Sequence, residues 1–248
     1  MTSESVARSE LRIAVVPGFE KSMTWPQVRY LVDGVDLFVV VHGDSDWLGL
    51  DPDTMLDPDA PLIPNESGRR VILLMCSCAE IGCGSFSASI EWSPDGDRVV
   101  WTAGRWASGE SDVVVVPDSD RLDDWPSPRS HPLCIEFDRQ QYLDEVARAT
   151  ADRRWETDSR ITARLLADRL RPLDIVVEPD FRFQRCSPDD RNGGIRVSYL
   201  SPTVRPHSQQ LLTVDSLLTD PVARADDIAE RMLSVDPQRW AVDFPPKW

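Results

Sequence analysis

The sequence predicts an α+β protein: an antiparallel β meander or barrel-like layer at the N-terminus, a central helix pair, and a C-terminal β-hairpin followed by a helix. Two observations lead to this prediction. Short apolar runs separated by turn residues fill residues 11–138, and the apolar period changes to helical spacing after Asp138. We therefore expect an acidic antiparallel β domain over 1–138 and an α+β unit over 139–248, either as two domains or as one continuous domain.

The β layer is predicted from its turns and its apolar runs. Asp33-Gly34 separates two apolar runs, and both residues tolerate the positive φ of a type I′ hairpin turn. Further short strands are expected at 71–76, 86–92, 98–102, 113–116 and 133–137. Their close spacing along the chain is typical of an antiparallel sheet.

Two helices are expected to follow the β layer directly. Asp138 is a good N-cap for a helix over about 139–155, whose apolar residues recur at helical spacing. Thr157 or Asp158 can cap a second helix, and Pro172 ends it because proline lacks the backbone N–H that a helix interior needs.

The last part of the chain returns to strands before a final helix. Alternating apolar residues at 181–183 and 195–199 flank a turn-rich segment at 188–194, which predicts a hairpin. A strand is expected at 211–214. Asp220-Pro221 then provides an N-cap and a proline in the first helical position, which predicts a helix to about Val235.

The charge of the chain is strongly negative and unevenly distributed. The whole sequence has 42 acidic and 27 basic residues, and residues 1–138 hold 24 of the acidic but only 10 of the basic ones. A surface of this kind repels nucleic acid, so we expect no nucleic-acid partner. The N-terminus has no apolar signal region and no apolar run is long enough to cross a bilayer, so we expect a cytoplasmic protein with no membrane association.

The densest acidic stretch runs from His42 to Gly68 and contains neither lysine nor arginine. We expect a long surface loop here, either simply solvated or presented to a basic partner. The candidate partner-binding residues are Asp44, Asp46, Trp47, Asp51 and Asp53. A calcium site is a weaker alternative, because an EF-hand beginning at Asp44 would have Leu48 and Met55 where oxygen ligands are required.

A cysteine cluster is the second candidate site. Cys76, Cys78 and Cys83 form a C-x-C-x4-C pattern at the end of a predicted strand, and thiolates so placed can supply three of the four ligands that zinc requires. Cys134 or His131 is the candidate fourth ligand. Buried, unreactive thiols are the simplest interpretation, and a redox-responsive thiol is the remaining one. The cofactor expectation is therefore none, or zinc.

Sequence motifs for catalysis are weak. The three histidines are scattered, and no nucleophile elbow, metalloprotease, phosphate-loop or dinucleotide pattern occurs. A cysteine-dependent enzyme stays as a remote alternative, because a Cys–His pair can form between distant segments. The sequence thus favours a protein that is not an enzyme.

Four motifs resemble an uncharacterised family of bacterial, mainly actinobacterial, proteins. They are C-S-C-A-E-I-G-C at 76–83, V-W at 100–101, F-D-R-Q-Q-Y at 137–142 and D-R-R-W-E-T at 152–157, against a family pattern of C-x-C-G-x-x-G-C, V-x-W, F-D-x-x-Q-Y and W-E-T. Ala79 stands where the family pattern has glycine. The resemblance implies a bacterial cytoplasmic setting, and it implies no activity, ligand or partner.

Two functional hypotheses follow. The first is a non-catalytic accessory or binding protein whose acidic, tryptophan-bearing N-terminal face docks a basic protein, comparable with toxin-neutralising immunity proteins by an analogy of charge alone. The second is a metal-binding or redox-responsive thiol protein centred on the cysteine cluster. The oligomeric state is left open by the sequence.

Overall fold

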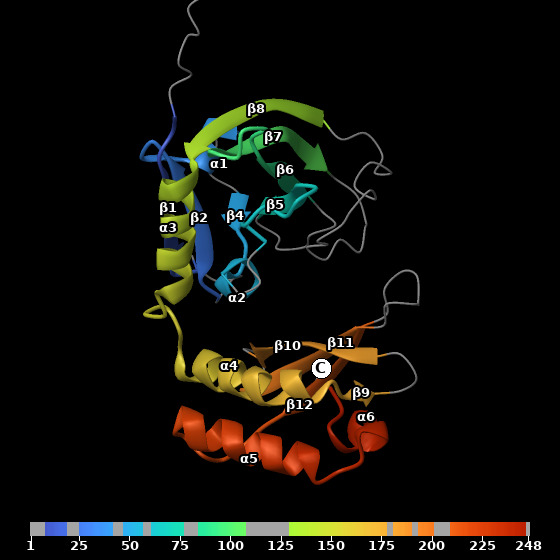
Figure 1. The fold of residues 1–248 in the computed structure, drawn as a ribbon. Helices are drawn as coiled ribbons and strands as arrows, with labels where there is room; N and C mark the ends of the chain where they lie inside the picture. Colours follow the sequence, from blue (N-terminus) through green and yellow to red (C-terminus); the bar gives the residue numbers. More distant parts are fainter. Residues whose placement is uncertain are drawn as a thin grey trace, which may run out of the picture. The chain divides into compact units, whose positions relative to one another are not determined.

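The chain forms two compact units. A computed structural model describes residues 8–18, 25–41, 47–56, 61–76, 84–107, 129–177, 181–189, 193–200 and 209–246. By their contacts, Met1–Trp155 form one unit and Glu156–Trp248 the other. Each combines helices with antiparallel sheet pairs, so the predicted α+β class is confirmed (Figure 1).

The N-terminal unit begins with a small three-stranded sheet. Its strands are β1 (Leu11–Val16), β2 (Gln27–Val32) and β3 (Val35–Asp36), in that spatial order. The predicted Asp33-Gly34 turn joins β2 to β3, and both residues have positive φ, 53° and 78°. The apolar run that follows forms the short helix α1 (Leu37–Val41), which buries Leu37, Phe38 and Val41 and leaves Val39 and Val40 exposed.

The second sheet is a curled antiparallel meander, as a barrel-like layer requires (Figure 1). Its strands are, in spatial order, β4 (Trp47–Gly49), β5 (Arg69–Cys76), β6 (Ser85–Trp92), β7 (Arg98–Ala107) and β8 (Arg129–Asp138). Four of the predicted strands fall within β5 to β8 and are confirmed. The fifth, at 113–116, lies outside the described residues.

The two sheets approach each other closely at Gly49 of β4. The Val28 N–H of β2 donates to the Leu50 carbonyl at 2.9 Å. A Cβ atom at position 49 would lie 1.7 Å from the Val28 carbonyl oxygen, so only glycine permits this approach. The short helix α2 (Pro52–Met55) follows and packs on β2.

Helix α3 (Arg139–Ala151) leaves β8 without an intervening loop. The Asp138 side chain accepts from the N–H groups of Gln140 and Gln141, which confirms the predicted cap. The helix ends before the predicted position 155, because Asp152 adopts an extended conformation. Since α3 packs on β1, it belongs to the N-terminal unit, and the two units divide after Trp155 and not at the predicted boundary after Asp138.

An aromatic cluster forms the centre of the N-terminal core. Trp101 is fully buried, and its ring lies 5.2–6.2 Å from the rings of Tyr30, Phe137 and Tyr142. The Trp101 indole N–H donates to the Tyr142 hydroxyl at 3.2 Å, and this hydroxyl donates to the Leu62 carbonyl at 2.7 Å. The polar groups of Trp101 and Tyr142 are thereby hydrogen-bonded, whereas the buried Tyr30 hydroxyl has no hydrogen-bond partner among the described residues.

The C-terminal unit packs two long helices and a four-stranded sheet around its own core. In chain order its elements are α4 (Asp158–Leu170), the 3-10 turn η2 (Arg171–Leu173), β9 (Val176–Val177), β10 (Phe181–Asp189), β11 (Gly194–Leu200), β12 (Gln209–Val214), α5 (Pro221–Leu233), the 3-10 turn η3 (Pro237–Arg239) and α6 (Trp240–Asp243). The β10–β11 hairpin, strand β12 and the Asp220-capped helix were all predicted and are confirmed.

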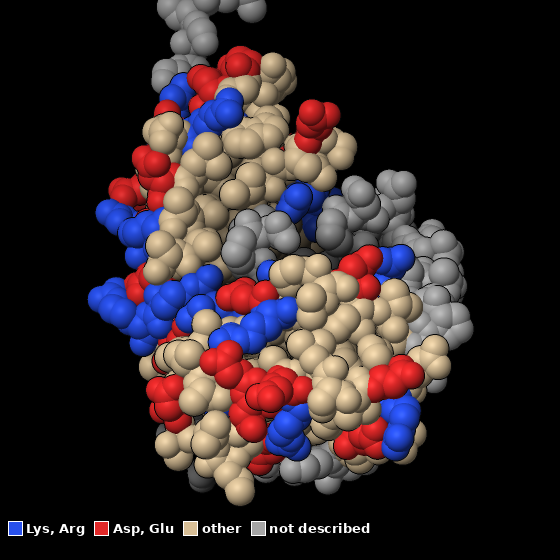
Figure 2. All heavy atoms as spheres, turned by 60° about the horizontal axis from the view of Figure 1, so that its bottom comes forward, with Lys and Arg blue, Asp and Glu red and all other residues tan. Residues whose placement is uncertain are grey.

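The surface of the C-terminal unit mixes both signs of charge. Red and blue atoms alternate over the face that Figure 2 presents, and Arg169 of α4 pairs with Asp226 of α5 at 2.5 Å. Residues 156–248 hold 15 acidic and 13 basic residues, against 27 and 14 in residues 1–155. The negative charge of the chain therefore belongs to the N-terminal unit.

Candidate functional site

The cysteine cluster lies at the connection between β5 and β6. Cys76 is the last residue of β5, whereas Cys78 and Cys83 lie outside the described residues. Met75 is the cross-strand partner of Ser85, so the two ends of the cysteine-bearing segment are held side by side by the sheet.

The two candidates for a fourth zinc ligand lie on β8, with β6 and β7 between them and β5. Cys134 stands opposite Thr102 and has an exposed, unbonded thiol, and His131 stands opposite Gly104. Among the side chains that the structure describes, no three His, Cys, Asp or Glu residues form a metal-binding group. The zinc site therefore stays a prediction.

The prediction of a long surface loop over 42–68 is wrong for the described part of this stretch, because β4 and α2 lie in it and Leu50, Met55 and Leu56 are buried. The candidate acidic face itself is described only in part. Asp44 and Asp46 lie outside the described residues, and Trp47 begins β4. Asp51 caps α2, because its side chain accepts a hydrogen bond from the Asp53 N–H at 2.9 Å. Asp53 lies in the first helical turn, where its negative charge interacts favourably with the positive end of the helix dipole. These two carboxylates thus also stabilise the local fold.

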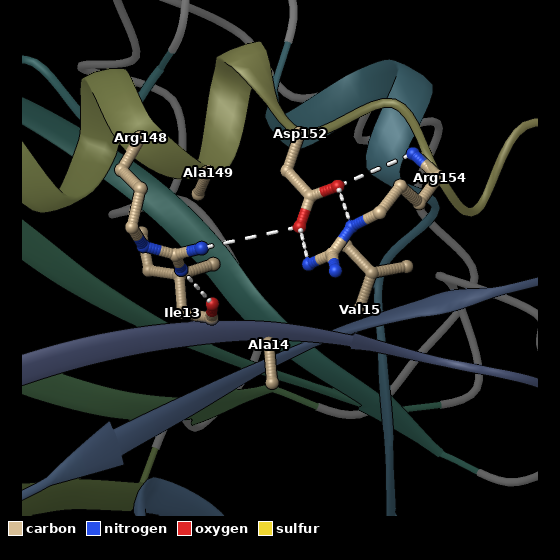
Figure 3. A pocket seen from close by; sticks show the side chains of 7 residues that line it. All are labelled: Ile13, Ala14, Val15, Arg148, Ala149, Asp152 and Arg154. Atoms are coloured by element: carbon tan, nitrogen blue, oxygen red, sulfur yellow. Dashed lines mark hydrogen bonds and ion pairs between the residues drawn. The ribbon is translucent and has the colours of Figure 1, made fainter.

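A pocket that no sequence motif indicated lies between the free edge of β1 and the C-terminal end of α3 (Figure 3). Its volume is about 230 Å³, and its lining residues are Ile13, Ala14, Val15, Arg148, Ala149, Asp152 and Arg154. All of them belong to the N-terminal unit, so this pocket is formed by a single folded body.

The orientation of β1 follows from its pairing with β2. The Asp33 N–H donates to the Glu10 carbonyl at 2.9 Å, so Glu10 faces β2. Successive residues of an antiparallel strand alternate between the two edges, which directs the backbone groups of Leu11, Ile13 and Val15 away from β2. These residues form the free edge of the small sheet.

Side chains of α3 occupy most of this free edge. The Leu11 N–H donates to Gln141 Oε1 at 3.2 Å, and Gln141 Nε2 donates to the Leu11 carbonyl at 2.7 Å. Two residues further along, the Ile13 N–H donates to Glu145 Oε1 at 2.6 Å, and Arg148 donates to the Ile13 carbonyl at 2.6 Å. The helix thus supplies donors and acceptors where a neighbouring strand would.

Glu145 is a buried carboxylate whose charge is satisfied. It is 4% exposed and also accepts two hydrogen bonds from Arg148, both 2.7 Å long. Burial alone would raise the pKa of Glu145, but the bonds from Arg148 and from the Ile13 N–H outweigh it and hold this pKa below its ordinary value. Glu145 is therefore a fixed anion that orders both β1 and Arg148.

The rim of the pocket carries a second set of charges (Figure 3). Asp152 accepts from Arg154 Nε at 2.9 Å and from Arg154 Nη2 at 2.7 Å, and Arg148 Nη1 lies 4.0 Å from the same carboxylate. The hydrogen bonds from Arg154 lower the pKa of Asp152, which stays ionised. The lining side chains therefore carry two positive charges and one negative.

No helix in the described part of the chain is both long and apolar enough to span a membrane. No protein-family model, curated protein or solved structure matches the chain.

Proposed function

We propose that the protein is a non-catalytic binding protein whose acidic N-terminal unit docks a basic protein partner. The observation that carries the proposal is that the carboxylates of this unit outnumber its basic residues, while several of its described arginines are already paired within the unit. Residues 1–155 hold 27 acidic and 14 basic residues, so this unit carries a formal excess of 13 negative charges.

Several arginines are engaged with carboxylates that the fold itself uses. Arg8 bonds to Asp97 and Asp138 at 2.9 Å each. Arg98 likewise bonds to Asp95 at 2.8 Å and to Glu136 at 2.7 Å. The stretch 42–68 has no basic residue of its own. The excess carboxylates of the N-terminal unit repel one another. A partner that carries positive charge would reduce this repulsion, and the negative potential of the unit would attract it over a distance.

The proposal predicts that the protein binds a basic partner in a salt-dependent way, and that this binding depends on Asp44 and Asp46. The double variant Asp44→Asn/Asp46→Asn is expected to weaken binding of a basic protein from native lysate about three- to tenfold at low salt, because two attractive charges are removed. Pull-down at low and high salt, with identification of the bound protein and its isoelectric point, measures this.

The matched control removes the same charge from the other unit. Asp227→Asn/Glu230→Gln on α5 is expected to leave capture unchanged. Equal retention by both double variants, or retention that does not respond to salt, would contradict the proposal.

A second candidate function is metal or thiol chemistry at the cysteine cluster. The specific observation in its favour is the Met75–Ser85 pairing, because the segment of the chain that carries Cys76, Cys78 and Cys83 runs between these two paired residues. Thiolates gathered within a short connection are common ligands of zinc.

This candidate predicts about one zinc per chain in tag-free protein purified without chelator. Plasma mass spectrometry measures the metal content directly. Cys78→Ser is expected to lose the metal, while Cys186→Ser is the matched control, since Cys186 is a buried thiol of β10 in the other unit. Wild-type protein without zinc would exclude a stoichiometric zinc site, and Cys134→Ser tests whether β8 takes part.

A further inference from the structure

The pocket beside β1 exists because one side chain in a regularly spaced series on α3 is too short to reach the strand. Gln141, Glu145 and Ala149 follow one another at intervals of four residues on the face of α3 that meets β1. Four helical residues rise by about 6 Å and two strand residues by about 6.8 Å, so each member of the series faces one member of the series Leu11, Ile13, Val15.

The first two positions of the α3 series provide hydrogen bonds to the backbone of β1, and the third position does not. Gln141 bonds to both backbone groups of Leu11, and Glu145 with Arg148 bonds to both backbone groups of Ile13. Ala149 is 3% exposed and its side chain ends at Cβ. Within the described residues, no hydrogen bond reaches the outward N–H or carbonyl of Val15, and the pocket occupies this place.

A group that complements Val15 must present one acceptor and one donor side by side. A residue of an extended peptide, paired antiparallel with Val15, does this by exchanging two hydrogen bonds with it. Such a peptide would meet the Glu145–Arg148 pair at the next edge position, Ile13. The peptide therefore has to end in the pocket.

The direction of the strand decides which end it is. A peptide that runs antiparallel to β1 approaches Ile13 with its C-terminal end. Arg154 is paired with Asp152 (Figure 3), and Arg148 is paired with Glu145, so the charges of these four side chains balance. The side chains of Arg148 and Arg154 are nevertheless 45% and 89% exposed. Their remaining N–H groups can donate charge-assisted hydrogen bonds to a terminal carboxylate.

We propose that this pocket binds the C-terminal residue of an extended peptide, which pairs antiparallel with Val15 and places its terminal carboxylate against Arg148 and Arg154. None of the lining residues belongs to the acidic stretch 42–68, and the proposal does not depend on the basic partner. Its ligand class is a peptide with a free C-terminus.

The first test uses N-acetyl-trialanine as the free acid and as the C-terminal amide. In isotopically labelled full-length protein, the free acid at millimolar concentration is expected to shift the Val15 amide resonance in a saturable way. The amide is expected to bind at least ~10-fold more weakly, because it loses the charge-assisted hydrogen bonds. Absence of a saturable shift at Val15 would overturn the proposal, and equal binding of the two peptides would overturn the assignment of the carboxylate.

The second test fills the gap in the series. Ala149→Gln is expected to place a carboxamide on Val15 as Gln141 does on Leu11, and so to abolish peptide binding. The matched control is Ala147→Gln on the exposed face of the same helix, which should bind normally. Full peptide binding by folded Ala149→Gln protein would overturn the proposal.

A third variant avoids the interior of the unit altogether. Arg154→Gln removes an exposed guanidinium, and it is expected to weaken binding of the free acid several-fold while leaving binding of the amide unchanged. Unchanged affinity for the acid would show that Arg154 does not contact the carboxylate and would overturn its role.

Discussion

Trp101→Ala is expected to lower the free energy of unfolding of the N-terminal unit by about 3–5 kcal/mol. Trp101 is fully buried and contacts three other aromatic rings, so its loss leaves a large cavity. It also removes the indole N–H that donates to Tyr142. Urea unfolding, followed by a probe that resolves the transitions of the two units, measures the change.

The C-terminal unit provides the internal control for this prediction. Its core is formed by residues such as Tyr199 and Trp240, and none of them belongs to the cluster around Trp101. The transition of the C-terminal unit is therefore expected to stay in place. Trp101→Phe should cost clearly less than Trp101→Ala, because a ring remains; equal losses in the two variants would contradict the packing explanation.

Glu145→Gln is expected to destabilise the N-terminal unit by about 2–3 kcal/mol at neutral pH, because the charge-assisted bonds from Arg148 and from the Ile13 N–H are weakened. The loss should depend on pH. Since the pKa of Glu145 is lower in the folded protein than in the unfolded chain, its charge stabilises the fold above the ordinary glutamate pKa of about 4.3. This contribution disappears as the pH falls through the lower, folded-state pKa.

The pH dependence separates Glu145 from other carboxylates of α3. The difference in unfolding free energy between wild type and Glu145→Gln is expected to be constant near neutral pH and to shrink below about pH 4. Denaturant titrations at a series of pH values measure it. Asp144→Asn, on the exposed face of the same helix, is the control and should have little effect. A difference that does not change with pH would refute the role given to the Glu145 charge.

Local signals in the sequence were sufficient for most elements of the fold. Asp138 and Asp220 were predicted as helix caps, and Asp33-Gly34 as a hairpin turn, because each acts through its own side chain or its own φ angle. The helix at Leu37–Val41 shows the limit of such signals. A short apolar run contains no period that distinguishes a helix from a strand, so packing decides.

The pocket could not be predicted in the same way. It depends on Val15 and Ala149, which are far apart in the chain, lining the same pocket. It therefore depends on the register between helix α3 and strand β1. The polar residues Gln141 and Glu145 on the inner face of α3 were the available signal, since polar side chains there need a partner. The sequence alone does not indicate which backbone groups Gln141 and Glu145 bind.

The way α3 covers β1 also bears on self-association. An open strand edge is a template on which further chains can add, and proteins restrict such edges with charges or short lengths. Here Ser9 pairs with Phe137 of β8, and Gln141, Glu145 and Arg148 close the next two positions. Within the described residues, Val15 is the one outward-facing position of β1 that no hydrogen bond reaches. A single open residue is enough to hold one peptide end, and it is too short to nucleate a growing intermolecular sheet.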